Sequence, residues 1–123
     1  MDAPRAKFQP VDPGFAARVR ASFGRQKAMA LIGAELTVVE PGYAEIALPY
    51  RDDLTQQKGY VHGGVIGMIA DTACGYAVAR GQVLRPGRTL TVARGEVYAE
   101  DGKPVATMLQ TLMMLPDTPD APE

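Results

Sequence analysis

Apolar and polar residues alternate with two different periods along this chain. Between residues 13 and 25 apolar side chains recur at every fourth position, which predicts a short amphipathic helix with Asp12 as N-cap and Pro13 in its first turn. Residues 34–39 and 43–48 are rich in β-formers and flank a Pro-Gly turn. These two segments predict a β-hairpin.

The central segment has the pattern of a buried helix. Residues 63–78 consist mostly of Ala, Gly, Ile, Val and Met, with very few polar side chains. Three predicted strands follow, over residues 80–84, 88–99 and 104–115, and the Asp101-Gly102 turn joins the last two. A hairpin, one helix and a run of antiparallel strands indicate an α+β fold.

Length and composition limit the number of domains and the classes of partner. The 123 residues suffice for a single core, so we expect one domain over 13–115, an N-terminal arm over 1–12 and a disordered, proline-rich acidic tail over 116–123. The net charge is -1, and Lys and Arg are scattered along the chain. This distribution argues against a nucleic-acid surface.

Cysteine and histidine usage bears on compartment and metal binding. Cys74 is the single cysteine, which excludes an internal disulfide and favours a reducing, cytoplasmic setting. We find neither a signal-peptide pattern nor the roughly 18 consecutive apolar residues of a membrane span, so no membrane partner is expected. One His and one Cys do not supply a zinc set, and we predict no metal and no cofactor.

The candidate chemistry lies between Gly59 and Asp71. The only histidine, His62, precedes a glycine pair at the predicted helix start, where backbone N–H groups are able to polarise a carbonyl. Asp71 follows within an apolar run, and a buried carboxylate costs several kcal/mol unless it is paired or protonated, so we expect it to be functional. The ordinary alternatives are a simple glycine turn, a spacer histidine and an unseen cationic partner for Asp71. A Cys74 nucleophile is a weaker alternative.

These residues also carry a resemblance to a known family. His62-Gly63-Gly64 with Asp71 at the ninth position after the histidine, together with 53–57 and 100–106, resembles the PaaI-like (phenylacetic-acid-degradation type) acyl-CoA thioesterases of the 4-hydroxybenzoyl-CoA thioesterase superfamily. The resemblance implies a hotdog fold, in which an antiparallel sheet wraps around a central helix. It extends from about residue 15 to residue 115.

The resemblance implies roles for the matching residues. Asp71 is expected to act as general base or as nucleophile toward the thioester carbonyl, and the N–H of Gly64, or alternatively of Gly63, to polarise the thioester oxygen. His62 and Gln56 are expected to position these groups. Many family members have an asparagine where this chain has Gln56.

The resemblance also implies a substrate and a partner. It predicts hydrolysis of aryl- or fatty-acyl-CoA to free acid and CoA by a homodimer, or a dimer of dimers, whose sites form between subunits. We assign Gly63 and Thr72 to substrate binding, and Arg85 and Arg88 to a CoA phosphate, with a solvated turn as the alternative for these two arginines.

One segment departs from the family pattern. The predicted helix runs directly into residues 80–84 with no turn residues between them, so the fold is expected to be one strand short. An internal deletion, a naturally shortened member and a helix that ends earlier than 78 are three explanations. The alternative function is therefore a catalytically inactive hotdog protein that binds acyl-CoA or serves as a scaffold.

Overall fold

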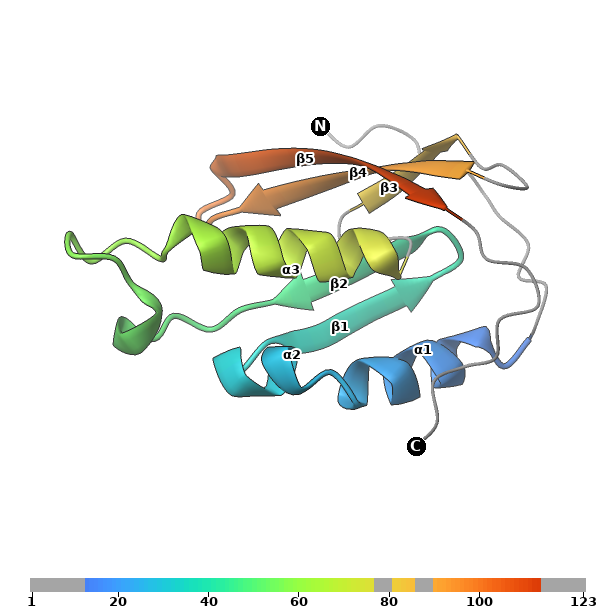
Figure 1. Ribbon diagram of the computed structural model, residues 1–123, viewed down its shortest axis with the longest axis horizontal. Helices are drawn as coiled ribbons and strands as arrows, with labels where there is room; N and C mark the ends of the chain where they lie inside the picture. The colour runs from blue at the N-terminus through green and yellow to red at the C-terminus, as the bar shows by residue number, and fades with distance from the viewer. Residues whose placement is uncertain (1–12, 77–80, 86–89, 114–123) are drawn as a thin grey trace.

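The computed structural model describes residues 13–76, 81–85 and 90–113. Helices and strands follow one another in an order close to the predicted one (Figure 1). The elements are α1 (Phe15–Gly24), α2 (Lys27–Ile32), β1 (Glu35–Glu40), β2 (Tyr43–Ala47), the 3-10 turn η1 (Asp52–Leu54), α3 (Gly63–Gly75), β3 (Gly81–Arg85), β4 (Leu90–Tyr98) and β5 (Pro104–Met113).

Helix α3 is the centre of the molecule. It contacts β2, β3, β4 and β5, and Figure 1 shows it between the β1-β2 hairpin and the β3-β4-β5 sheet, with α1 and α2 along the side of β1. All of the described strand pairs are antiparallel. This arrangement confirms the predicted α+β hotdog fold, in which antiparallel strands surround one apolar helix.

Strand β5 forms one border of the described sheet. The strand order is β3-β4-β5, and the register places Gln110 of β5 opposite Ala93 of β4. Side chains of β5 alternate in exposure along its second half, so Leu109 and Met113 are 68% and 67% exposed while Met108 and Gln110 are half-buried. One face of β5 therefore points toward α3 and the other toward solvent.

Within the described residues, the core consists of two clusters on opposite sides of α3. Met29 and Ile32 of α2 pack with Ile69 in the first cluster. Cys74 and Ala93 form the second, with Met108 and Leu112 of β5 packed against them. Because α3 contributes to both clusters, its apolar residues join the hairpin side to the sheet side.

Two predictions about the N-terminal region are corrected. Helix α1 begins at Phe15 with Gly14 as its N-cap, so Pro13 precedes the helix, and Asp12 lies outside the described residues. The sequence reading also missed α2, whose six residues are too few to display a helical period. Gly33 ends α2 in the left-handed conformation, with φ 75°, which a glycine adopts without strain.

The end of the central helix is also corrected. Helix α3 stops at Gly75 rather than at Val78, and Tyr76 is its C-cap. The Tyr76 hydroxyl is hydrogen-bonded to Ser22 Oγ (2.8 Å) and accepts from Gln26 Nε2 (3.0 Å), which holds this end against α1. The helix thus ends earlier than predicted, which is one of the three explanations for its direct junction with the strand that follows. The described strands still number five.

Several predicted segments lie outside the described residues. They are the arm over 1–12, the link over 77–80, the turn over 86–89 and the tail over 116–123. The two predicted turns within the described part are present, and each has a glycine at positive φ, Gly42 at 72° and Gly102 at 84°.

Candidate functional site

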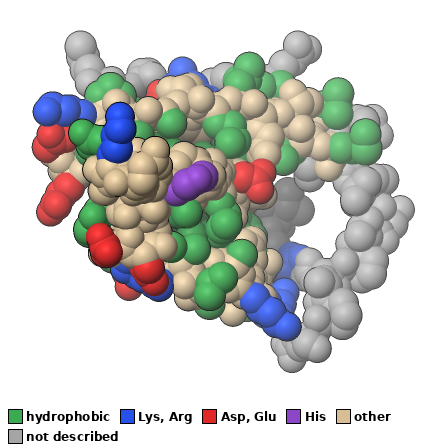
Figure 2. All heavy atoms as spheres, turned by 60° about the vertical axis from the view of Figure 1, so that its left-hand side comes forward, with side chains coloured by type: hydrophobic (Ala, Val, Ile, Leu, Met, Phe, Trp, Pro, Cys, Tyr) green, Lys and Arg blue, Asp and Glu red, His purple; other side chains and the backbone are tan. Residues whose placement is uncertain are grey.

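His62 fixes the start of α3. It is the N-cap residue, and its ring Nδ1 accepts a hydrogen bond from the Gly64 N–H at 2.9 Å. Its carbonyl accepts from Val65 (3.0 Å) and Ile66 (3.2 Å), which begins the helical ladder. An accepting Nδ1 leaves the proton of a neutral imidazole on Nε2. In Figure 2 the histidine lies at the surface among hydrophobic side chains.

The two glycines after His62 differ in what their N–H groups are free to do. The Gly64 N–H is taken by the His62 ring. The Gly63 N–H belongs to the first helical residue and has no acceptor within the part of the chain that the structure describes. The geometry therefore favours Gly63 over Gly64 as the donor available to a substrate oxygen.

Gln56 lies in a tight loop that leads into His62. Its side-chain Oε1 accepts from the Lys58 N–H, and its own N–H donates to the Tyr60 carbonyl at 2.8 Å. Gly59 turns the loop with φ 82°, and the His62 N–H donates to Leu54 at 2.9 Å. The Gln56 amide thus holds its own loop in this chain, and its role toward water or substrate stays a prediction.

Arg51 anchors the other end of this loop. Its guanidinium donates to Asp53 at 3.0 Å and 2.6 Å, and to the Leu31 carbonyl of α2 at 3.0 Å. The hydrogen bonds and opposite charges lower the pKa of the Asp53 carboxyl and raise the pKa of Arg51. Both side chains are exposed, so this pair orients the loop more than it stabilises the fold.

The environment of Asp71 differs from the buried one predicted from the sequence. Although the sequence places it in an apolar run, the carboxylate is exposed in the described chain, because Ile69, Ala70 and Thr72 take the buried positions on either side of it. Its partner is an amide rather than the cation considered from the sequence: Gln110 Nε2 donates to Asp71 Oδ1 at 2.6 Å.

Gln110 is the residue that sequence reasoning missed at this site. The face of β5 that points toward α3 carries Ala106, Met108, Gln110 and Leu112, so the amide is the one polar member of an apolar set. A single polar residue in an otherwise apolar inward face is a signal that the sequence contained. Pairing it with Asp71 required the tertiary structure, because 39 positions separate the two residues.

Gly63 and Asp71 lie too far apart to act on one carbonyl within a single chain. Eight residues separate them, which is about 12 Å along a helix at 1.5 Å per residue. Gly63, Gly67, Asp71 and Gly75 are spaced four apart and so form one ridge of α3 with almost no side-chain bulk. A second helix could approach this ridge closely.

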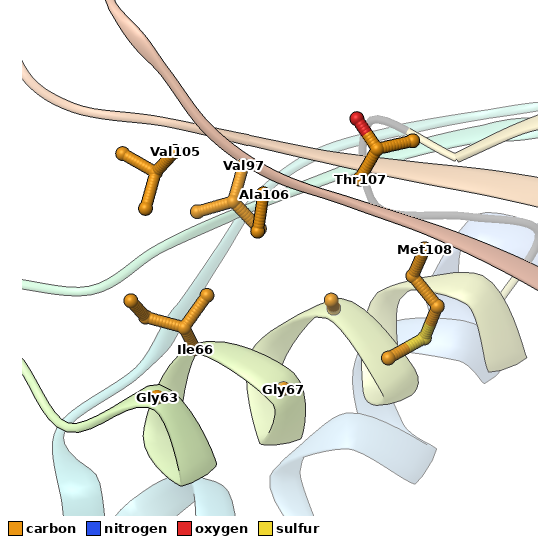
Figure 3. Close-up of a pocket in the computed structure, with 9 residues that line it drawn as sticks. Gly63, Ile66, Gly67, Val97, Val105, Ala106, Thr107 and Met108 are labelled. Carbon is orange, nitrogen blue, oxygen red and sulfur yellow. The ribbon is translucent and has the colours of Figure 1, made fainter.

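A groove of about 260 Å³ lies between α3 and the sheet, with Gly63 at its edge. Figure 3 shows Ile66 on α3 facing Val97 and Val105, and Met108 pointing from β5 toward the helix. The lining is mostly apolar and consists of Gly63, Ile66, Gly67, Ala70, Val97, Val105, Ala106, Thr107 and Met108. An acyl group suits such a surface.

The remaining predicted site residues lie elsewhere. Thr72 is buried, and its hydroxyl donates to Gln26 Oε1 at 3.3 Å, on the side of α3 that faces the α1-α2 junction. Its part in substrate binding stays a prediction. The side chain of Arg85 and the whole of Arg88 lie outside the described residues.

Cys74 lacks the surroundings of a nucleophile. Its side chain is fully buried, and desolvation together with the negative charge of Asp71 raises the pKa of the thiol to about 11. A reactive cysteine needs an accessible thiolate, which these surroundings disfavour. Asp71 is therefore the better candidate for the reacting group.

Within residues 13–76, 81–85 and 90–113, no group of three or more His, Cys, Asp or Glu side chains is arranged to hold a metal ion. No helix in the same residues has the length and apolarity to cross a membrane.

Solved structures with the same fold include thioesterase-family proteins. A thioesterase family protein from Silicibacter pomeroyi is 38% identical over 81% of this chain and 97% of that chain, with a TM-score of 0.75. The PaaI protein of the phenylacetic acid degradation operon of E. coli has a TM-score of 0.75 at 18% identity, over 83% of this chain and 94% of its own. A conserved protein from Pseudomonas aeruginosa has a TM-score of 0.67 at 24% identity, over 73% and 94%. No protein-family model and no curated protein sequence matches.

Proposed function

The chain belongs to the hotdog-fold thioesterase family, and from this premise we propose that it hydrolyses aryl- or fatty-acyl-CoA thioesters, with Asp71 as the reacting carboxylate and the Gly63 N–H as the oxyanion donor. The observation that carries the proposal is the ridge of α3. It combines an N–H at the helix start, without an acceptor among the described residues, with an exposed carboxylate two turns later, beside an apolar groove.

The reaction follows from what these groups are able to do. In the general-base route, Asp71 takes a proton from water while the water oxygen bonds to the thioester carbon. The negative charge on the carbonyl oxygen is stabilised by the Gly63 N–H and by the positive end of the α3 dipole. The C–S bond then breaks, and the CoA thiolate takes the proton back from Asp71. In the nucleophilic route, Asp71 Oδ attacks the thioester carbon, the C–S bond breaks and the CoA thiolate leaves, and water then hydrolyses the resulting anhydride to the free acid and Asp71.

The 12 Å between Gly63 and Asp71 supports a site shared by two chains. If two copies of α3 pack antiparallel about a two-fold axis near Gly67, which is midway between the two residues, Asp71 of each copy lies opposite Gly63 of the other. Gly67 and Gly75 allow such helices to approach closely. The homodimer would also cover the exposed Asp71 and keep bulk solvent from the oxyanion, apart from the water that reacts.

Hydrolysis of a panel of acyl-CoA thioesters, followed by detection of the released thiol, tests the proposal. We expect Asp71→Asn to lower kcat at least a thousandfold while the circular dichroism spectrum is unchanged. Glu35→Gln is the matched control, since Glu35 is an exposed carboxylate on β1. Label found in Asp71 after a single turnover in ¹⁸O-water would identify the nucleophilic route, because water that attacks the Asp71 carboxyl carbon of the anhydride leaves its oxygen there, whereas the general-base route labels only the product acid.

The same panel separates catalysis from binding alone. A wild-type protein that binds acyl-CoA without releasing thiol would contradict the proposal and would favour the inactive acyl-CoA-binding protein, for which the predicted lack of one strand is the argument. Full activity in Asp71→Asn would also contradict it. Sedimentation of the same samples reports whether active protein is dimeric, which the shared site requires.

A further inference from the structure

The contact between Asp71 and Gln110 joins the exposed face of α3 to the inner face of β5. Gln110 Nε2 lies 2.6 Å from Asp71 Oδ1, a short distance for an N–H···O hydrogen bond. A carboxylate only accepts, so an ionised Asp71 fixes which end of the amide faces it. The contact therefore orients both side chains.

Gln110 is held more firmly than its partner. It pairs with Ala93 in the β4-β5 ladder, and its neighbours on the same face, Met108 and Leu112, pack against the core. Its Oε1 atom is buried and has no hydrogen-bond partner within the described residues. A buried, unpartnered carbonyl oxygen is destabilising, and a Met at this position would avoid that penalty. Stability alone does not explain the amide.

The contact leaves the two carboxylate oxygens of Asp71 in different states. Oδ1 is occupied by Gln110, whereas Oδ2 has no hydrogen bond within the described part of the chain. A carboxylate on an exposed helix face would otherwise rotate among several orientations. Anchoring Oδ1 to a strand selects one orientation and keeps Oδ2 available to accept a proton or to attack.

From these observations we propose that Gln110 is a positioning residue for Asp71, whose amide holds Oδ1 so that Oδ2 faces the thioester. This inference rests on the proposed thioesterase function. Gln110 does not touch the reacting atoms and acts only through Asp71. Misplacement of a catalytic group by about 1 Å costs on the order of a hundredfold in rate, which sets the scale of the expected effect.

The test compares Gln110→Met, which keeps the length of the side chain but not its amide, with Thr111→Val, which removes a polar group from the opposite face of β5. We expect Gln110→Met to lower kcat by ten- to a hundredfold with KM within about twofold of wild type. Its melting temperature should be no lower than that of wild type, because the unpartnered Oε1 is removed. Thr111→Val should leave kcat unchanged.

A double mutant shows whether Gln110 acts through Asp71. In the Asp71→Asn background, Gln110→Met should cause no further loss of activity, because the group that it orients is already absent. A further loss as large as the one in wild type would overturn the proposal. So would unchanged kcat in Gln110→Met, or a fall in kcat explained by a lower melting temperature. These results differ from a failure of the proposed function, in which wild type itself releases no thiol.

The contact is also measurable without turnover. In the NMR spectrum of the wild-type protein, one side-chain amide proton of Gln110 should be shifted downfield by the hydrogen bond, and the shift should disappear in Asp71→Ala. An amide signal that does not respond to Asp71→Ala would overturn the proposal.

Discussion

The Cys74 sulfur occupies the space beside Gly95, at the interface between α3 and β4. A Cβ atom added at Gly95 would be 3.0 Å from Cys74 Sγ and 3.6 Å from the Ala70 carbonyl oxygen. The helix approaches the sheet this closely only because β4 has no side chain at that position. The same spacing between helix and sheet sets the distance from β5 to Asp71, which lies three residues before Cys74.

Gly95→Ala should therefore destabilise the fold. We expect the free energy of unfolding, measured with urea, to fall by about 1–3 kcal/mol, since the added methyl group has no space beside the sulfur. Cys74→Ala provides the control by removing that sulfur. The double mutant should lose less than the sum of the two single losses, and strictly additive losses would contradict the contact.

The thiol of Cys74 should make stability depend on pH in the alkaline range. Burial and the charge of Asp71 raise its pKa from 9.0 to about 11, so the unfolded chain loses this proton at lower pH than the folded chain does. The stabilisation is complete below about pH 9 and is lost as pH rises toward 11. Urea unfolding across this range should show a steeper decline for wild type than for Cys74→Ala. Equal slopes would mean that the thiol does not contribute.

Substitutions of His62 should separate its capping role from any role in catalysis. His62→Leu removes the acceptor for the Gly64 N–H and should cost about 1 kcal/mol of stability, whereas His62→Asn keeps an N-cap acceptor and should retain most of it. If His62 only positions the helix start, His62→Asn should also retain most of kcat. Inactive His62→Asn with normal stability would instead assign the ring a direct role.

Gly67 should influence assembly of the shared site. A Cβ atom at this position meets nothing within 4 Å, so Gly67→Leu should fold normally as a single chain. Because Gly67 lies at the proposed two-fold axis, we expect the leucine to keep two α3 helices apart and to lower kcat at least tenfold for long and short acyl-CoA alike, with loss of the dimer in sedimentation. Gly24→Leu, at an open position in α1, controls for the higher helix propensity of leucine. A fully active, dimeric Gly67→Leu protein would contradict the shared site.

Local chemistry explains which elements could be predicted from the sequence. Each of the two hairpins has a glycine at positive φ in its turn, a signal contained in a few consecutive residues. Helix α3 has a long apolar run that begins at a side-chain cap. The length of α3 could not be predicted in the same way. The C-cap, Tyr76, is hydrogen-bonded through its hydroxyl to Ser22 and Gln26, which are about fifty positions earlier in the chain.

The site was predictable to a similar extent. The segment from His62 to Asp71 is continuous in sequence, so the helix start and the carboxylate were predicted together. The exposure of Asp71 depends on which side of α3 the sheets occupy, and its contact with Gln110 depends on the β4-β5 register. Neither is encoded within a window of ten or twenty residues.

The connectivity of the sheets has a consequence for the order of folding. The β1-β2 hairpin and the β3-β4-β5 meander each pair strands that are neighbours in the chain, so each requires little loop-closure entropy and is able to form early. Helix α3 packs against both of these local units. We therefore expect its docking to be a late step of folding, because it brings contacts from both units together. The ridge that carries Gly63 and Asp71 thus lies on the segment that is expected to dock last.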